Sequence, residues 1–194
     1  MQDSAAQLLK KIRTLQDRFE QDLSERRKQF AYRVENGKVR FEAQARRRNK
    51  ALKVGLGRFL AQTRPLVVLT APVIYAMILP FVLLDVFVSL YQRICFPVYG
   101  IPRVNRRDYI KLDRHQLSYL NGLQKLNCLY CGYCNGLIAY VGEIAGRTEA
   151  YWCPIKHAMR VAGRHRHYPE FLDYGDGEGW VQGVQRSRDR LKGL

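Results

Sequence analysis

The sequence predicts a mainly α-helical protein inserted in a membrane, and three observations carry this prediction. The stretch 65–101 is almost wholly apolar. The segments on both sides of it are basic, and their apolar residues recur at helical spacing. Four of the five cysteines follow the apolar stretch. We therefore expect four parts: a basic helical arm (1–64), a membrane-inserted segment (65–101), a helical Cys/His module (102–168) and a basic, partly flexible tail (169–194).

The beginning of the arm predicts an amphipathic helix. Apolar residues recur three and four positions apart on one face, at Leu8, Ile12, Leu15, Phe19 and Leu23. We expect this stripe to pack against another part of the protein, with self-association or a partner helix as the alternative. Asn36-Gly37 predicts a break. Beyond it a second helix is expected, with one face formed by Phe41, Ala45, Leu52, Leu56 and Leu60.

The charge of the arm indicates an acidic partner. The whole chain has a net charge of +16, and the part 26–64 has thirteen Lys and Arg against only Glu35 and Glu42. A basic helix next to a membrane segment is typical of binding to anionic lipid head groups. Nucleic acid is disfavoured, because the arm has no recognisable reading motif. The first fifteen residues have no apolar core, so we expect no cleavable secretory signal.

The apolar segment allows two topologies. Its stretch from Leu66 to Leu84 has nineteen residues without a charge, about 28 Å as a helix. Pro72 and Pro80 would kink or break that helix. Positive charge on both flanks favours placing both on the cytoplasmic side, which a re-entrant hairpin bent near Leu79-Pro80 would achieve. A single kinked span and a buried helix of a soluble protein are the alternatives. Asp85 is expected to lie at the interface, where it snorkels or pairs with Arg93, and an intramembrane ligand or proton site is the alternative.

The cysteines predict a metal site. Cys128 and Cys131 are separated by two residues, a spacing that resembles the knuckle of many zinc modules. Cys153 and His157 are four apart and share a face if Pro154 opens a helix. We therefore expect a closed zinc site formed by Cys128, Cys131, Cys153 and His157, with Cys134 as an alternative ligand.

Two other interpretations of the cysteines stay open. The spacing of Cys128, Cys131 and Cys134, with a remote Cys153 before proline, resembles the bacterial ferredoxin pattern and would imply a 4Fe-4S cluster. The same cysteines could instead be reduced thiols in a helical core. Between the two halves of the site, 135–152 predicts a helix with a favourable Glu143–Arg147 pair, and a β-hairpin is the alternative.

These features predict a location and a class of function. We expect a membrane-anchored zinc scaffold, assembly factor or regulatory subunit that docks a partner protein at an anionic membrane. The alternatives are an iron–sulfur redox protein attached to a membrane complex and a monotopic membrane enzyme. The sequence favours a non-catalytic role, since no catalytic residue is evident. We expect the bacterial cytoplasmic membrane, with the cysteine module on the reducing, cytoplasmic side.

Overall fold

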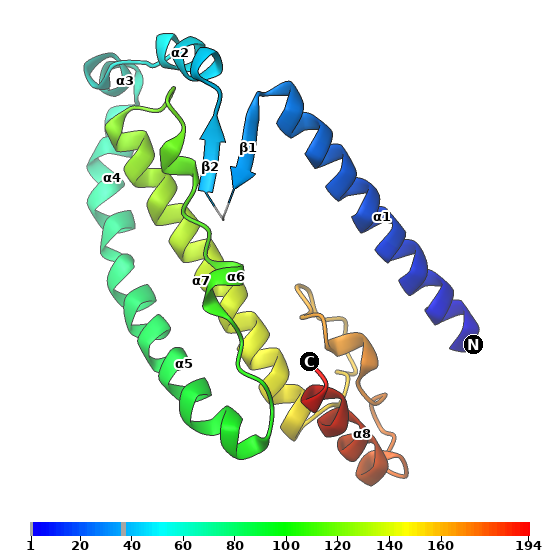
Figure 1. Ribbon diagram of the computed structural model, residues 1–194. Helices are drawn as coiled ribbons and strands as arrows, with labels where there is room; N and C mark the ends of the chain where they lie inside the picture. Colours follow the sequence, from blue (N-terminus) through cyan, green and yellow to red (C-terminus); the bar gives the residue numbers. More distant parts are fainter. Residues whose placement is uncertain (1, 36–37) are drawn as a thin grey trace. The chain divides into compact units, whose positions relative to one another are not determined.

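The computed structural model describes residues 2–35 and 38–194 and shows a mainly helical protein, as predicted (Figure 1). The chain divides into two compact units. The first unit comprises Met1–Ala61 and Asp113–Lys125, and the second comprises Gln62–Leu112 and Leu126–Leu194. The predicted break at Asn36-Gly37 lies outside the described residues.

The first unit contains one long helix, a β-hairpin and short helices. Its elements are α1 (Gln2–Gln29), β1 (Tyr32–Glu35), β2 (Lys38–Phe41), α2 (Ala43–Ala51), α3 (Leu56–Gln62, ending one residue beyond the unit) and η1 (Arg114–Gln116). The predicted amphipathic helix is confirmed as α1. In its apolar stripe Ile12 is 50% exposed, and Leu15 and Phe19 are each 62% exposed. The packing partner that we expected for this stripe is therefore not found among the described residues.

The β-hairpin occupies part of the second helix that the sequence predicts. Its strands are antiparallel, with Tyr32 opposite Phe41 and Arg33 opposite Arg40. Because side chains alternate along a strand, each of these pairs lies on its own face of the hairpin, one apolar and one basic. The prediction of one continuous second helix is wrong, since Phe41 belongs to a strand and the helical residues that follow divide into α2 and α3.

The second unit is dominated by the apolar segment, which forms α4 (Pro65–Ala76) and α5 (Ile78–Tyr99). The two helices are joined at Met77 and give one helical path of 35 residues (Figure 1). Pro72 lies inside α4, and Gly100 ends α5 in the left-handed conformation, with a φ of 68°. The re-entrant hairpin bent near Leu79-Pro80 is therefore wrong, because the helix continues through these residues.

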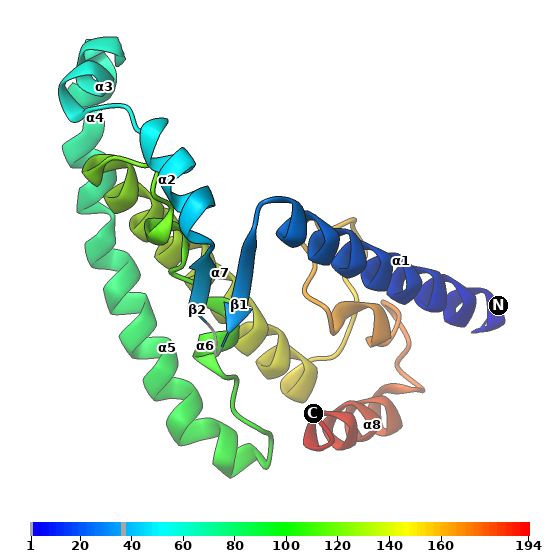
Figure 2. The same cartoon turned by 45° about the horizontal axis from the view of Figure 1, so that its top comes forward.

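α7 (Gly122–Trp152) belongs to the second unit from Leu126 onward, and this part runs parallel to the apolar path and lies beside it in Figures 1 and 2. The Tyr130 hydroxyl donates to the Ile74 carbonyl at 2.8 Å. Further along both helices, the hydroxyls of Tyr91 and Thr148 lie 3.0 Å apart. The contacting residues advance in the same direction on both helices, which defines a parallel pair.

The segment 101–112, here called the returning segment, follows α5 in the second unit and includes the short helix α6 (Arg106–Tyr109). Val104 pairs with Gln92, and Arg106 pairs with Asp85. These contacts move back along α5 as the chain moves forward. The segment therefore runs antiparallel to α5, and it delivers its charged residues to the side of the apolar helix.

α7 changes the interpretation of the cysteine module. It is one helix of 31 residues that includes Cys128, Cys131 and Cys134. The tight metal-binding loop expected at these cysteines is wrong, whereas the helix expected over 135–152 is confirmed. The helix expected to begin at Pro154 is also wrong, because the chain after Cys153 is irregular.

The end of the chain closes the core of the second unit. After η2 (Tyr168–Glu170), helix α8 (Trp180–Lys192) forms where the sequence predicts a partly flexible tail. Leu191 is fully buried, and the Ser187 hydroxyl donates to the Ala150 carbonyl at 2.7 Å. The core comprises Phe96, Ile101, Val104, Leu137, Tyr140, Ile144, Ala150, Tyr168, Phe171 and Leu191.

Gly136 is the point of closest approach between α7 and the returning segment. A Cβ atom at Gly136 would lie 2.8 Å from both the Ile110 Cα and the Tyr109 carbonyl oxygen, so backbone would have to move. We expect Gly136→Ala to lower the free energy of unfolding by about 1–3 kcal/mol. Thermal unfolding followed by circular dichroism in mild detergent measures this change.

Gly142 provides a matched control in the same helix. A Cβ atom there has nothing within 4 Å, so Gly142→Ala should stabilise the helix by about 0.5–1 kcal/mol. Equal stability of the two alanine variants would contradict the packing of the returning segment against α7.

Candidate functional site

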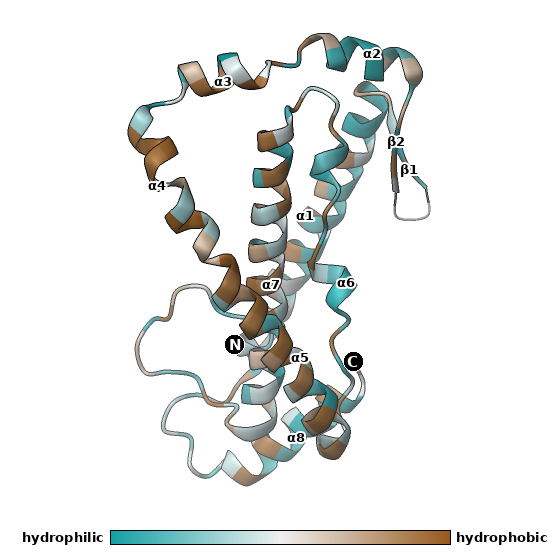
Figure 3. Cartoon of the chain, turned by 90° about the vertical axis from the view of Figure 1, so that its left-hand side faces the viewer, coloured by the Kyte–Doolittle hydropathy of each residue, from teal (hydrophilic) through white to brown (hydrophobic). Residues whose placement is uncertain are grey.

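The apolar helix has an outer face that the rest of the described structure leaves uncovered. Among the described residues, Pro65–Tyr99 is the one helix long and apolar enough to cross a membrane, and none of its most apolar part is buried. Figure 3 shows the apolar residues along α4 and α5. The exposed apolar residues, here called the outer face, are Leu66, Val67, Val68, Leu69, Val73, Ile74, Met77, Leu79, Val82, Leu83, Leu84, Val86, Phe87, Leu90, Ile94 and Val98.

The opposite side of the helix carries its polar groups. Asp85, Ser89 and Gln92 are spaced three and four apart on α5 and face the rest of the second unit. Gln92 is only 6% exposed. A helix in a soluble protein normally has the reverse arrangement, with apolar residues inside and polar residues outside. This helix has its apolar residues exposed and its polar residues buried, an arrangement typical of a helix that contacts lipid. We call it the inverted helix.

Asp85 is the centre of a hydrogen-bond network on this inner side. Arg106 donates to it through Nε, at 3.0 Å to Oδ1, and through Nη2, at 2.6 Å to Oδ2. The Tyr133 hydroxyl donates at 2.9 Å and the Ser89 hydroxyl at 3.3 Å. Asp85 is thus paired with Arg106, 21 residues along the chain, and the expected pairing with Arg93 is wrong.

Gln92 fixes the returning segment to α5. Its Oε1 accepts from the Val104 backbone N–H at 2.9 Å, and its Nε2 donates to the Val104 carbonyl at 3.3 Å. The same Nε2 also donates to the Tyr140 hydroxyl on α7. A buried amide with partners on two other segments holds the three in register.

Glu143 forms a second polar centre on α7, deep in the second unit. Its Oε1 accepts from Arg147 Nε at 2.8 Å and from Arg166 Nη2 at 2.5 Å, and it lies 3.2 Å from His167 Nε2. Burial by itself raises the pKa of Glu143, but the hydrogen bonds from His167, Arg147 and Arg166 outweigh burial and hold the pKa at about 2. The carboxylate therefore stays charged and ties the loop after α7 to the helix.

Histidine and arginine residues of this loop are thus structural partners. His165 Nε2 lies 2.8 Å from Glu149 Oε2. Arg147 also donates to the Pro102 carbonyl at 2.7 Å, which joins the returning segment to the same centre. The two carboxylates of α7 hold both irregular segments of the second unit in place.

The predicted metal ligands lie in different surroundings. On α7, Cys131 is exposed, Cys128 is half-buried and Cys134 is buried. Burial raises the pKa of the Cys134 thiol, which favours the neutral thiol over the thiolate that metals bind. Cys153 is exposed just after α7. His157 stacks with Tyr168, and its backbone N–H donates to the Tyr168 hydroxyl at 2.8 Å.

The described part of the chain brings no set of ligands together. Within residues 2–35 and 38–194 there is no group of three or more His, Cys, Asp or Glu residues that could hold a metal ion. The zinc site and the 4Fe-4S cluster therefore stay predictions of the sequence. Metal analysis of the purified protein, with Cys153→Ser as the matched variant, tests both.

Sequence reasoning missed most of the polar network. Arg106, Tyr133, Arg166 and His167 each pair with a carboxylate at least 21 residues away. One signal in the sequence was Glu143–Arg147, whose spacing of four predicts a pair on a helix. An acidic residue in an otherwise apolar helix also predicts a cationic partner, but it does not say which one.

Comparison with known proteins found no protein similar to this chain. No protein family, curated protein or solved structure matches the chain. Function is therefore inferred from the geometry of the chain itself.

Proposed function

We propose that this protein is a membrane-embedded docking protein that inserts the outer face of α4 and α5 into one leaflet of an anionic membrane. In this role it anchors a partner protein at the membrane surface and catalyses no reaction. The observation that carries the proposal is the inverted helix, apolar where it is exposed and polar where it packs. Burial of exposed apolar area in lipid contributes about 25 cal/mol per Å².

Insertion from one side is favoured over a complete span by the charges beside the helix. Arg103, Arg107 and Asp108 are exposed on the returning segment, next to the contacts with Gln92 and Asp85. If the whole helix crossed the bilayer, these charges would enter the hydrocarbon at about 2.5–3.5 kcal/mol each. Its 35 residues, about 52 Å as a helix, also exceed the roughly 30 Å hydrocarbon thickness. A helix lying in the interface avoids both costs.

Anionic lipid is the partner that the charge of the chain favours. The net charge is +16. In the first unit, α2 carries Arg46, Arg47, Arg48 and Lys50, and none of its residues is buried. Each basic residue near an anionic surface contributes about 1 kcal/mol of attraction. The zinc scaffold predicted from the sequence is compatible with this role, and it awaits the metal analysis described above.

The proposal is tested by labelling both ends of the helix on the same molecule. Gln62→Cys and Arg103→Cys, both exposed positions of the second unit, are combined in a chain whose five native cysteines are replaced by serine. The protein is reconstituted into sealed anionic vesicles and treated with a membrane-impermeant maleimide. Intact-mass analysis then counts the labels on each molecule, so a mixture of orientations does not matter.

One-sided insertion predicts molecules with two labels or none. Molecules with a single label would show that the two ends lie on opposite sides and would contradict the proposal. Labelling in detergent provides the control, since both cysteines should then react on every molecule. Vesicle flotation of the cysteine-free chain shows that the replacements leave membrane binding intact.

A further inference from the structure

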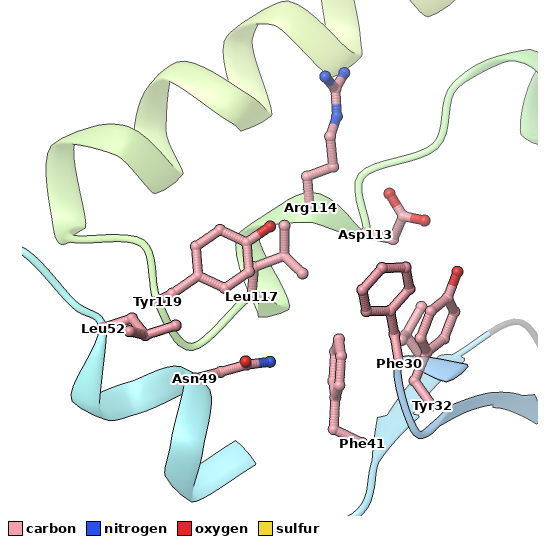
Figure 4. A pocket seen from close by; sticks show the side chains of 10 residues that line it. Phe30, Tyr32, Phe41, Asn49, Leu52, Asp113, Arg114, Leu117 and Tyr119 are labelled. Atoms are coloured by element: carbon pink, nitrogen blue, oxygen red, sulfur yellow. The ribbon is translucent and has the colours of Figure 1, made fainter. Parts of the chain in front are cut away.

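The apolar stripe of α1 is uncovered in the described part of the first unit. Ile12 is 50% exposed, and Leu15 and Phe19 are each 62% exposed. The rest of the unit holds α1 at its end, where Phe30 lines a cavity of about 550 Å³ together with Tyr32 of the β-hairpin (Figure 4). Phe19 precedes this end by about three helical turns. Exposed apolar surface of this kind marks a contact with another molecule.

Charged residues lie along both edges of the stripe. Lys11 and Arg13 adjoin Ile12 in the chain, and each is rotated by about 100° from it, to opposite sides. Asp22 lies about three turns beyond Lys11 on the same edge, and Glu20 lies about two turns beyond Arg13 on the other edge. All four charged residues are exposed, and no ion pair to any of them occurs between residues that the structure describes.

The charges of the two edges share one centre of symmetry. The midpoint between Lys11 and Asp22 along the chain is also the midpoint between Arg13 and Glu20, and it lies directly after Gln16. A twofold axis at this midpoint places a second copy of α1 antiparallel to the first, with each of these basic residues opposite an acidic one. A parallel pair would instead place each charge beside the same charge. The pattern is therefore self-complementary, as an interface between identical chains requires.

We propose that the apolar stripe binds α1 of a second copy of this chain in an antiparallel helix pair. With the charges matched, Leu15 of each copy packs against Phe19 of the other. An anionic membrane is a poorer occupant of the stripe, because it would repel Glu20 and Asp22 on the two edges. The stripe belongs to the first unit, so the proposal is independent of the insertion of α4 and α5 into lipid.

Charge reversal tests the pairing. The full chain is held in detergent micelles, which cover the outer face of α4 and α5, and sedimentation equilibrium gives the dissociation constant of the dimer. Arg13→Glu places like charges together at two symmetric contacts and should weaken the dimer about tenfold. Adding Glu20→Arg to the same chain should restore the native constant. Within one helix these two positions are too far apart to contact each other, so the restoration reports a contact between copies.

Two further variants provide the control and the apolar test. Lys10→Glu also reverses a positive charge, but on the side of α1 away from the stripe, and it should leave the dissociation constant unchanged. Phe19→Ser replaces an exposed side chain and should weaken the dimer at least 100-fold, while circular dichroism shows the native helix content.

Single cysteines determine the direction of the pair, in a chain whose five native cysteines are replaced by serine and which dimerises as the native chain does. Gln16→Cys lies beside the twofold axis, so a short bis-maleimide should link the two copies there. Arg26→Cys should not be linked, because antiparallel pairing separates its two copies by about 28 Å.

The contrary outcomes are equally specific. Linking through Arg26→Cys but not through Gln16→Cys would show a parallel pair and would overturn the proposal. A chain that is monomeric at every concentration, or a double reversal that restores nothing, would also overturn it. A monomeric chain whose Phe19→Ser variant floats less with anionic vesicles would assign the stripe to lipid instead.

Discussion

Glu143→Ala is expected to lower the free energy of unfolding of the second unit by about 3–5 kcal/mol, because removal of one partner leaves buried charges uncompensated. The side chain of Glu143 is 5% exposed and that of Arg147 is 9% exposed. Arg166 and His167 lose the same partner. Denaturant unfolding in mild detergent, followed by tryptophan fluorescence, measures the change, since both Trp152 and Trp180 belong to the second unit.

Asp189 provides the control for this effect. Its ion pair with Lys192 is exposed on both sides, and exposed pairs contribute little to stability. Asp189→Asn should therefore leave the unfolding midpoint unchanged. An equal loss of stability in the two variants would contradict the central position that we assign to Glu143.

The Glu143 network also predicts how stability depends on pH. The pKa of Glu143 is about 2 in the folded protein, below its ordinary value of 4.5. The unfolded chain therefore takes up the proton at a higher pH than the folded chain does. The contribution of Glu143 is complete above about pH 4.5 and is lost as the pH falls from there towards 2. In Glu143→Ala this part of the acid-induced loss should disappear.

Leu83→Arg combined with Phe87→Arg is expected to reduce membrane partitioning by about 10³- to 10⁵-fold, because the costs of the two arginines add. Leu83 is 59% exposed and Phe87 is 66% exposed, one helical turn apart on the outer face. Placing an arginine within the apolar region costs about 2.5–3.5 kcal/mol, and 1.4 kcal/mol corresponds to a factor of ten. Flotation of anionic vesicles over a range of lipid concentrations measures the partition coefficient.

Val181→Arg provides the matched control, because Val181 on α8 is 77% exposed but does not belong to the outer face. It should float as the native chain does. Unchanged flotation of the double variant would show that the outer face does not contact lipid. Loss of flotation in the control would show that any added arginine has this effect.

Local pattern and composition predicted much of the fold. The apolar residues between Leu8 and Leu23 recur at helical spacing, and this part of the chain forms α1. The apolar run beginning at Leu66 forms one helical path of 35 residues, and this path continues through Pro80. Pro80 is the third residue of α5, in the first helical turn, where the backbone N–H groups have no partner within the helix and a proline is tolerated. That is why the predicted bend did not occur.

The candidate site was harder to predict, because its contacts join segments far apart in the chain. Asp85 meets Arg106 only because the returning segment runs back along α5. The metal-binding loop predicted from the cysteines was wrong for a different reason. A spacing of three suits a metal-binding loop, but it also suits one side of a helix. Cys128 and Cys131 lie in such a helix, and no local signal separated the two geometries.

The most direct test of one-sided insertion is the depth of each residue along the helix, measured with nitroxide labels from Leu66 to Val98 in anionic vesicles. Relative accessibility to oxygen and to a water-soluble nickel complex gives that depth. We predict that depth oscillates with the 3.6-residue period of the helix, deepest at outer-face positions such as Leu83 and Phe87, with no trend from one end to the other. A depth that increases to the bilayer centre near the middle of the helix and then decreases would show a complete span and would contradict this account.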